Sequence, residues 1–312
     1  YFGVAGKNRV LNTRTRRLFV GRIVDKANHA EDEVIFVDRS LMALLWPLVD
    51  QLETVRHLIV MDDGDGEVPD DPRVLDYEEL LSSASPVNFE VKDEKQAASM
   101  CYTSGTTGNP KGVVYSNRST YRHTITTMPA DGLGVCESDV ILPVVPMFHV
   151  NSWGLQHAAV AAGATLVNPG PKLQPEPIAE LMESEKVTIA AGVPTKWMGV
   201  LEELDGRDVS SLRAIPCGGS AVPKSLSEGY KNKIGLPILQ AWGMTETSPL
   251  AAIAHVKSAE ANLDEETKAD LRASVGTIVP PVEFRICEPH SIEELPCDGE
   301  SSSKSQGRRS FI

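Results

Sequence analysis

A glycine- and threonine-rich stretch, Cys101 to Val114, sets the strongest limit on the fold of this chain and on its ligands. Two apolar runs flank a loop of small and hydroxylated residues that ends in Lys111. The glycines of the loop allow backbone angles that other residues avoid, so successive N–H groups can turn toward one anion. Its hydroxyl groups add donors, and Lys111 adds a mobile positive charge. The stretch therefore predicts a polyphosphate-binding loop rather than a flexible linker.

The spacing of this loop disfavours an ordinary P-loop NTPase. A Walker A sequence has four residues between its glycines and a Ser or Thr directly after its lysine. Here two residues separate Gly105 from Gly108, and Gly112 follows Lys111.

Composition narrows the class of protein further. The chain has 312 residues, which suits about two domains, and it is 41% hydrophobic and 23% charged, as globular proteins are. Its net charge of −13 argues against a nucleic-acid partner, because phosphate neutralisation needs clustered Lys and Arg. No apolar run approaches the roughly 20 residues of a membrane span.

The five cysteines are dispersed and include no Cys-x-x-Cys pair, which favours a reducing compartment over a disulfide framework or zinc site. We expect a cytoplasmic protein, or one of an organelle matrix. The first residue is Tyr rather than Met, so we also expect a piece of a longer protein.

Alternating strand and helix patterns predict an α/β fold. A helix is expected over Gly21–Ala30, a short buried strand over Glu33–Asp38 and another strand over Val55–Met61. This alternation is typical of a parallel sheet. A further run of β-α units extends from about Asp139 to Pro249, with glycine-rich breaks at strand C-terminal ends, where such sheets bind ligands.

The pattern changes beyond Val275. Val275–Pro281 and Glu283–Ile286 are expected to be antiparallel strands, and the serine-rich segment from Ser301 is expected to be disordered. The acidic stretch Asp62–Glu79 lacks the EF-hand ligand spacing and is expected to be a solvated loop.

Two further stretches complement the phosphate loop. Gly218-Gly219-Ser220 leaves backbone uncovered, so a flat ring could lie against it. The stretch Trp242 to Glu246 offers a stacking aromatic, the hydroxyl of Thr245 and a carboxylate. A carboxylate near a polyphosphate usually implies Mg²⁺, which bridges the like charges through oxygen ligands.

His149 and Trp153 are predicted to pack or to line a pocket. No nucleophile motif such as Gly-x-Ser-x-Gly accompanies His149, which disfavours a role as general base.

The segments Tyr102–Val113 and Gln240–Pro249, in this order, resemble the AMP-binding, adenylate-forming superfamily. The intervening Pro146–Trp153, with the opening Tyr1–Val4 and Asn28–Asp32, is similar to the medium- and long-chain fatty acyl-CoA synthetase branch. The resemblance covers about residues 1 to 300.

The resemblance implies two stacked parallel-sheet αβαβα subdomains and the start of a β-barrel subdomain, without the family's small C-terminal domain. Residues 1–135 would form the first subdomain, incomplete at its N-terminus and containing the phosphate loop 102–113. Residues 136–274 would form the second and 275–300 the truncated β subdomain, whereas 301–312 would be a disordered tail unrelated to the family.

It also implies a two-step reaction of ATP, a fatty acid and coenzyme A, with Mg²⁺. Thr103 and Glu246 would share the metal, and Thr245, Glu246 and Lys111 would be catalytic. The β- and γ-phosphates would be held by Thr103, Ser104, Gly105, Thr106, Thr107, Gly108 and Lys111. The adenosine part would be bordered by Gly218, Gly219, Ser220, Gln240, Ala241 and Gly243, with Trp242 stacking and Thr245 near the α-phosphate. His149 and Trp153 would line the acyl tunnel.

The chain departs from the family after Gly299-Glu300. The carboxylate that holds the ribose, the hinge and the adenylation lysine of family members have no counterpart, so we expect little adenylation by this chain alone. Two alternatives stay open, namely a non-catalytic nucleotide- or acyl-binding fragment and activation of an aryl or amino acid. The expected partners are small molecules, and a homo-oligomer is compatible with the family.

Overall fold

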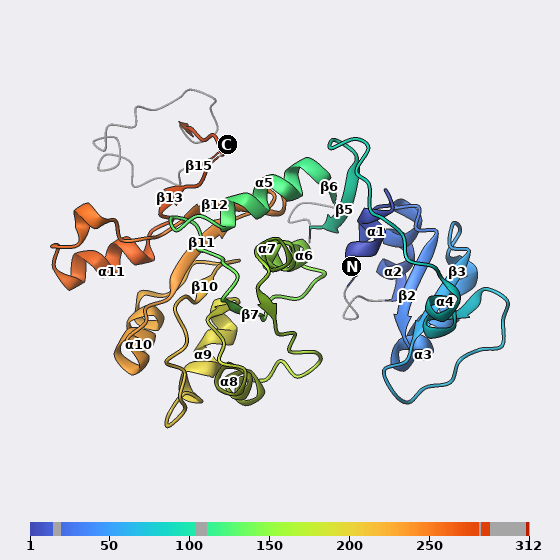
Figure 1. Ribbon diagram of the computed structural model, residues 1–312, viewed down its shortest axis with the longest axis horizontal. Coiled ribbons are helices and arrows are strands. Elements are labelled where there is room, and N and C mark those ends of the chain that lie inside the picture. The colour runs from blue at the N-terminus through green and yellow to red at the C-terminus, as the bar shows by residue number, and fades with distance from the viewer. Residues whose placement is uncertain (15–19, 104–110, 281, 288–309, 312) are drawn as a thin grey trace. The chain divides into compact units, whose positions relative to one another are not determined.

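The computed structural model describes residues 1–14, 20–103, 111–280, 282–287 and 310–311. The chain divides into two compact units (Figure 1). The first consists of Tyr1–Arg118 and Met147–Asn151, and the second of Ser119–Pro146 and Ser152–Ile312.

The first unit contains two small sheets with helices. Its elements are α1 (Phe2–Gly6), β1 (Leu11–Asn12), α2 (Val20–His29), β2 (Val34–Asp38), η1 (Arg39–Leu41), α3 (Met42–Leu45), η2 (Trp46–Gln51), β3 (His57–Met61), β4 (Val74–Asp76), α4 (Tyr77–Ser83), β5 (Ala97–Tyr102) and β6 (Gly112–Ser116). Strands β2, β3 and β4 are parallel, which confirms the predicted parallel sheet. In the other sheet, β5 lies between parallel β1 and antiparallel β6.

The core of the first unit lies against one face of the β2-β3-β4 sheet. Val37 is buried there with residues of α2, α3, η2 and β3. Val34 and Phe36 point to the other face and are 42% and 46% exposed, because side chains alternate along a strand. The prediction that Glu33–Asp38 is a buried strand is therefore wrong for alternate residues. The acidic residues at 62–67 are exposed, as predicted for a solvated loop. The predicted loop Asp62–Glu79 is wrong for its second part, because Val74–Asp76 form β4 and Tyr77–Glu79 begin α4.

The second unit is built around one extended sheet. Helices α5 (Asn117–Thr127) and α6 (Val150–Trp153) cross the unit boundaries. The other elements are β7 (Val140–Pro143), α7 (Leu155–Ala162), β8 (Thr165–Leu166), α8 (Pro175–Ser184), β9 (Ile189–Ala191), α9 (Pro194–Glu202), β10 (Pro216–Cys217), α10 (Lys224–Ile234), β11 (Leu239–Gly243), η3 (Thr245–Thr247), β12 (Leu250–Ile253), η4 (Ser258–Glu260), α11 (Glu265–Ala273), β13 (Thr277–Ile278), β14 (Ile286–Cys287) and β15 (Ser310–Phe311).

The sheet runs in the order β8-β7-β9-β10-β11-β12-β13, with single parallel bridges joining β9 to β10. Neighbours from β8 to β11 are parallel, which confirms the predicted run of β-α units. Strands β12 and β13 then add antiparallel pairs. The sequence patterns had not indicated β12 or α11.

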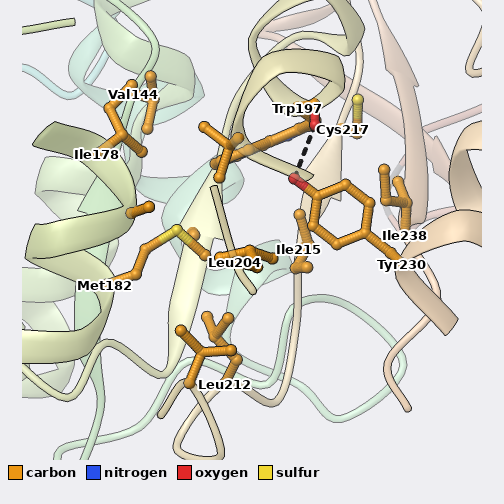
Figure 2. Close-up of a cluster of buried hydrophobic side chains, with 14 of the residues drawn as sticks. Val144, Ile178, Met182, Trp197, Leu204, Leu212, Ile215, Cys217, Tyr230 and Ile238 are labelled. Carbon is orange, nitrogen blue, oxygen red and sulfur yellow. Dashed lines mark hydrogen bonds between the residues drawn. The ribbon is translucent and has the colours of Figure 1, made fainter. Parts of the chain in front are cut away.

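Alternating residues of the strands point into two separate hydrophobic cores. Leu142 and Ala190 face one side, where they pack with residues of α8, α9 and α10. Ile141 and Ile189 face the other side and pack with residues of α7. Figure 2 shows the first core, with Trp197 and Tyr230 beside Ile215 and Met182. Helices thus cover both faces of the parallel strands, as in doubly wound α/β proteins.

A polar cluster of Asp139, Thr188 and Arg213 links the N-terminal ends of three parallel strands. Asp139, which precedes β7, is 2% exposed. Its carboxylate accepts hydrogen bonds from Arg213 Nε at 2.8 Å and Nη2 at 2.6 Å, and from Thr188 Oγ1 at 2.6 Å. Arg213 and Thr188 precede β10 and β9. Burial alone would raise the pKa of Asp139, but the hydrogen bonds from Arg213 and Thr188 lower it overall.

The C-terminal part differs from the expectation in its strand partners. β13 pairs with β12, and β14 pairs with β15. Both pairs are antiparallel, but the two predicted strands do not pair with each other. Among the described residues of the predicted ranges, only Thr277, Ile278 and Ile286 lie in strands. Most of the predicted disordered tail, 301–309 and 312, lies outside the described residues, and Ser310–Phe311 form β15. Among the described residues, no helix is both long and apolar enough for a bilayer span.

Removing one buried hydroxyl tests the core in Figure 2. Tyr230 Oη donates a hydrogen bond to the carbonyl oxygen of Trp197 at 2.8 Å, and both residues are 0% exposed. We expect Tyr230→Phe to lower the free energy of unfolding by about 1–1.5 kcal/mol, because a buried acceptor loses its donor. Urea unfolding measures this. Tyr121→Phe, at a residue 67% exposed, is the matched control and should change little. An equal effect of both variants would contradict the assignment.

Candidate active site

The predicted phosphate loop connects the two strands of a hairpin in the first unit. Strands β5 and β6 are antiparallel, with Tyr102 opposite Gly112. Thr103 N donates to the carbonyl oxygen of Lys111 at 3.0 Å, which closes the loop at its base. The predicted phosphate ligands Ser104, Gly105, Thr106, Thr107 and Gly108 lie outside the described residues.

Lys111 stands at the end of this loop with its side chain exposed. Across the residues with described positions, its ammonium group has no ion-pair partner. A lysine without a carboxylate partner keeps its full charge for an incoming anion. The hairpin thus fixes the backbone of Lys111 and leaves its charge available.

The start of the loop lies beside Lys26 and His29, and Asp32 pairs with the nearby Arg14. The Lys26 ammonium lies 5.1 Å from the centre of the Tyr102 ring, and Tyr102 Oη is 2.7 Å from His29 Nδ1. Burial lowers the pKa of Lys26, and the nearby charges of Arg14 and Arg22 lower it further. A lysine whose charge is disfavoured by other cations is stabilised by an approaching anion.

The segment Met147–Asn151 is anchored to the first unit through Asn151. This buried side chain donates from Nδ2 to Ser99 Oγ at 2.7 Å. Its Oδ1 accepts from Thr13 Oγ1 at 3.1 Å and from Cys101 Sγ at 3.2 Å. His149, predicted to line the acyl tunnel, is exposed in this anchored segment. The sequence analysis missed Asn151, and no local pattern marks it.

The backbone of residues 150–153 has left-handed helical torsion angles. Val150, Asn151, Ser152 and Trp153 have φ of 51°, 50°, 55° and 55°. Left-handed helical angles cost roughly 1–2 kcal/mol for each L-residue with a side chain. Such strain persists only where surrounding contacts hold it, and it concentrates at functional sites. The strain therefore supports a functional role for this segment.

The glycine-rich turn after β10 lies close to β11 in the second unit. A Cβ atom on Gly218 would meet the carbonyl oxygen of Ala241 at 2.4 Å and Trp153 Cη2 at 3.6 Å. Any side chain at Gly218 would therefore clash with the neighbouring backbone. Gly219 has φ +82°, and Gly219 and Ser220 are exposed. The structure brings Gly218, Ala241 and Trp153 together, which sequence spacing could not indicate.

The other motif forms the end of β11 and the turn that follows. Ala241 and Trp242 are strand residues, while Thr245 and Glu246 lie in η3. A Cβ atom on Gly243 would approach the carbonyl oxygen of Pro249 to 2.0 Å, so the turn closes tightly on itself.

Thr247, which the sequence analysis missed, holds this turn. Met244 N donates to Thr247 Oγ1 at 2.8 Å, and the Thr247 hydroxyl also contacts the carbonyl oxygen of Pro249. Glu246 is exposed and has no ion-pair partner within the described ranges of the chain. The turn therefore presents a carboxylate that is available to a cation.

Gln240 differs from the other predicted contact residues. It is 6% exposed, and its amide hydrogen-bonds to Val222, Ala273 and Ser274 within the protein. Thr103 and Lys111 belong to the first unit, whereas Gly218–Ser220 and Gln240–Glu246 belong to the second.

Comparison with known families adds to these observations. Residues 1–302 match the model of the AMP-binding enzyme family. The chain belongs to the AMP-binding enzyme family. The resemblance inferred from Tyr102–Val113 and Gln240–Pro249 is thereby confirmed.

Curated AMP-binding relatives align along the whole chain. A long-chain-fatty-acid–CoA ligase from Thermus thermophilus is 41% identical over 100% of this chain and 56% of its own length. A medium-chain-fatty-acid–CoA ligase from Ectopseudomonas oleovorans is 38% identical over 100% of this chain and 58% of its own. A 3-methylmercaptopropionyl-CoA ligase from Ruegeria pomeroyi is 37% identical over 96% of this chain. The chain spans a little over half the length of these relatives.

Solved structures show the same fold. The anthranilate CoA ligase AuaEII, in complex with anthranoyl-AMP, matches with a TM-score of 0.78 at 19% identity over 91% of this chain and 52% of its own. ATP-bound MatB from Rhodopseudomonas palustris matches with a TM-score of 0.74 at 21% identity over 92% of this chain and 53% of its own. The predicted α/β fold of adenylate-forming enzymes is confirmed.

Proposed function

We propose that this chain is the nucleotide-binding part of an acyl-CoA ligase that activates a fatty acid. In the first step, a carboxylate oxygen attacks the α-phosphorus of ATP and pyrophosphate leaves, which gives an acyl-adenylate. In the second step, the thiol sulfur of coenzyme A attacks the acyl carbon, AMP leaves with the bonding electron pair, and the thiol proton passes to solvent. The reaction replaces a poor leaving group, oxide, with a good one, AMP.

The phosphates of ATP would bind at the hairpin loop of the first unit. The loop Thr103–Lys111 would hold the β- and γ-phosphates through backbone N–H groups and hydroxyls. The exposed charge of Lys111 and the Lys26 ammonium beside Tyr102 support this placement. Preorganised positive charge at a transferring phosphoryl group contributes strongly to rate.

Other residues would contact the adenosine part of ATP and the acyl chain of the acid. Gly218, Gly219 and Ser220 would lie against adenine, since Gly218 has no room for a side chain and the other two are exposed. Trp242 would stack on the ring, and Thr245 would approach the α-phosphate. His149 and Trp153 would line the path of the acyl chain.

The available oxygen ligands fit Mg²⁺, which prefers one or two carboxylates together with substrate phosphates. Glu246 supplies an exposed carboxylate without an ion-pair partner in the described part of the protein. Thr103, in the first unit, supplies a hydroxyl, and the family resemblance assigns both residues to the metal. When bound, Mg²⁺ would neutralise charge that develops on the phosphate oxygens.

The match of residues 1–302 to the AMP-binding family carries the proposal. Calorimetric titration of the full chain with ATP and Mg²⁺ tests binding, and ATP–pyrophosphate exchange tests the first step. Acid-dependent exchange would support activation of an acid and would contradict the expectation that this chain alone adenylates little. Nucleotide binding without exchange agrees with that expectation, and it equally fits the alternative of a non-catalytic nucleotide-binding fragment. Absence of ATP binding would contradict both.

The acid itself needs a panel of substrates, because similar relatives are named for different acids. The ligases from Thermus and Ectopseudomonas are named for fatty acids, and the one from Ruegeria for 3-methylmercaptopropionate. A benzoate–CoA ligase from Arabidopsis thaliana is 30% identical over 88% of this chain. Exchange or binding that depends on benzoate rather than on medium- or long-chain fatty acids would favour the aryl alternative.

Two substitutions test the phosphate and metal assignments. We expect Lys111→Met and Glu246→Gln each to weaken the affinity for ATP·Mg²⁺ about 10- to 100-fold, because charge-assisted contacts contribute about 1.5–3 kcal/mol. The loss in Glu246→Gln should depend on Mg²⁺ and should largely vanish when EDTA is present, whereas that in Lys111→Met should persist. Titration calorimetry with and without Mg²⁺ measures both.

Matched controls come from exposed residues outside the proposed site. Lys172→Met and Glu202→Gln make the same chemical changes at exposed positions and should leave affinity unchanged. A wild-type affinity in Glu246→Gln with Mg²⁺ present would remove this residue from the metal site.

A further inference from the structure

The side chain of Gln240 is committed on both of its polar ends to backbone groups of the protein. Gln240 lies on β11, one position before Ala241, and is 6% exposed. Its Oε1 accepts a hydrogen bond from Val222 N at 2.9 Å. Its Nε2 donates to the carbonyl oxygens of Ala273 at 3.2 Å and Ser274 at 2.5 Å. Both amide hydrogens are used, so the side chain is bound to the protein on both ends.

The bond to Val222 fixes one end of an exposed loop. Gly219, Ser220 and Ala221 are exposed, while Gly218 and Val222 on either side are buried. Gly218 N donates to the carbonyl oxygen of Gly192 at 3.3 Å, which anchors the first end of the loop. Gln240 anchors the second. Two of the three exposed residues between the anchors, Gly219 and Ser220, are among those that would lie against a flat ring.

The bonds to Ala273 and Ser274 connect this loop to the end of α11. The last carbonyl groups of a helix lack partners within the helix, and Gln240 satisfies two that lie there. Helix α11 is itself held to α10 by Arg272–Glu228 at 2.8 Å and by the ion pair of Lys231 with Glu265. The position of the exposed loop thus depends on a helix that has no residue in the predicted site.

We propose that Gln240 is a positioning residue that sets the loop Gly219–Ala221 for the adenine ring, and that the end of α11 is the support of this loop. This inference rests on the proposed function and changes the predicted role of Gln240 from contact to support. An amide accepts on one side and donates on the other, and both functions are needed here. A carboxylate would accept from Val222 but would repel the two carbonyl oxygens of α11. Binding residues must be held within about 0.5 Å of the productive geometry by their supporting contacts.

Two substitutions of different chemistry test the role. Gln240→Glu keeps the acceptor for Val222 and loses the donors, whereas Gln240→Met keeps the volume and loses both. We expect each to weaken the binding of AMP and of ATP about tenfold or more. Binding of inorganic pyrophosphate should stay within about twofold of wild type, because the phosphate loop belongs to the first unit. Titration calorimetry of the full chain with each ligand measures this split.

A destabilised control separates support of the loop from a general loss of stability. Asp139→Asn weakens the polar cluster at the N-terminal ends of the strands, whereas Gly218 lies at the other end, directly after β10. Below its unfolding temperature this control should bind AMP as the wild type does.

Several results would overturn the inference. Wild-type AMP affinity in Gln240→Glu, or an equal loss of AMP and pyrophosphate binding, would do so. A loss of AMP affinity in Asp139→Asn as large as in Gln240→Met would also do so. If the wild-type chain itself binds neither AMP nor ATP, the proposed function fails first, which distinguishes the two failures.

Discussion

Replacing Asp139 by alanine is expected to lower the free energy of unfolding by about 3 kcal/mol. The substitution removes the acceptor of two Arg213 hydrogen bonds and one from Thr188, and it leaves the guanidinium without its carboxylate. Breaking one side of a buried ion pair costs about 3–5 kcal/mol. The lower end applies, because the Arg213 side chain is 39% exposed while that of Asp139 is 2% exposed. Urea unfolding followed by tryptophan fluorescence measures the change.

Asp205→Ala provides the control for this prediction. Asp205 forms an ion pair with Lys233 at 2.9 Å, but its side chain is 81% exposed. Pairs of this kind contribute at most about 1 kcal/mol. If Asp139→Ala lowers the free energy of unfolding as little as Asp205→Ala does, the polar cluster around Asp139 does not stabilise the sheet.

Acidification is expected to destabilise the second unit between pH 6.5 and pH 4 through His123. Burial first, and then the nearby His157, lower the pKa of this histidine from 6.5 to about 4. Above pH 6.5 the ring is neutral in both the folded and the unfolded chain, so the stability is fully present. As the pH falls, the unfolded chain binds a proton that the folded chain excludes. At about 1.4 kcal/mol for each pH unit, the loss reaches about 3 kcal/mol near pH 4.

The packing of His123 explains why the ring stays neutral. The residue lies on α5 and is 8% exposed. A Cβ atom on Gly154, just before α7, would lie only 2.7 Å from its Nδ1, so the ring packs directly on backbone. His157 on α7 has its own pKa lowered to about 4 by burial. A proton on His123 would therefore enter a buried region beside a second histidine.

Stability measured in urea at several pH values between 7.5 and 4 tests this. His123→Phe should flatten the profile by the contribution of His123. His57→Gln changes an exposed histidine and should leave the profile as it is in the wild type. The same slope in His123→Phe and wild type would contradict the assignment.

The sequence was sufficient for the alternation of the fold and for the location of both nucleotide motifs. Strand and helix periods are local, so β2 and β3 were expected near their observed positions, and β7 and β9 lie in the predicted run of β-α units. The phosphate loop was recognisable because its glycines, hydroxyls and lysine lie together in the chain. The order of the two stretches along the chain indicated the family as well.

Local sequence patterns could not predict strand pairings and hydrogen bonds between residues far apart in the chain. The chain turns back after Gly243, and β12 therefore pairs antiparallel with β11. That reversal depends on the close approach of Gly243 to Pro249, which no periodicity encodes. The role of Gln240 was also hidden, since its partners Val222 and Ser274 are separated from it by 18 and 34 residues.

The left-handed run at 150–153 shows a different limit. A β-branched residue such as Val150 normally avoids positive φ. Only contacts such as those of Asn151 with Ser99 and Thr13 make the conformation tolerable. Propensity therefore pointed away from the observed backbone at a segment that borders the predicted acyl site.

The path of the chain between the two units limits how the protein can be divided. The first unit consists of Tyr1–Arg118 and Met147–Asn151, and the residues between these two segments belong to the second unit. A single cut at residue 118 would therefore release a piece without Asn151. Ser99, Thr13 and Cys101 would then lose the partner they share. Dissection into independent halves would need a short peptide added in trans, or a circular permutant that keeps 147–151 joined to the first unit.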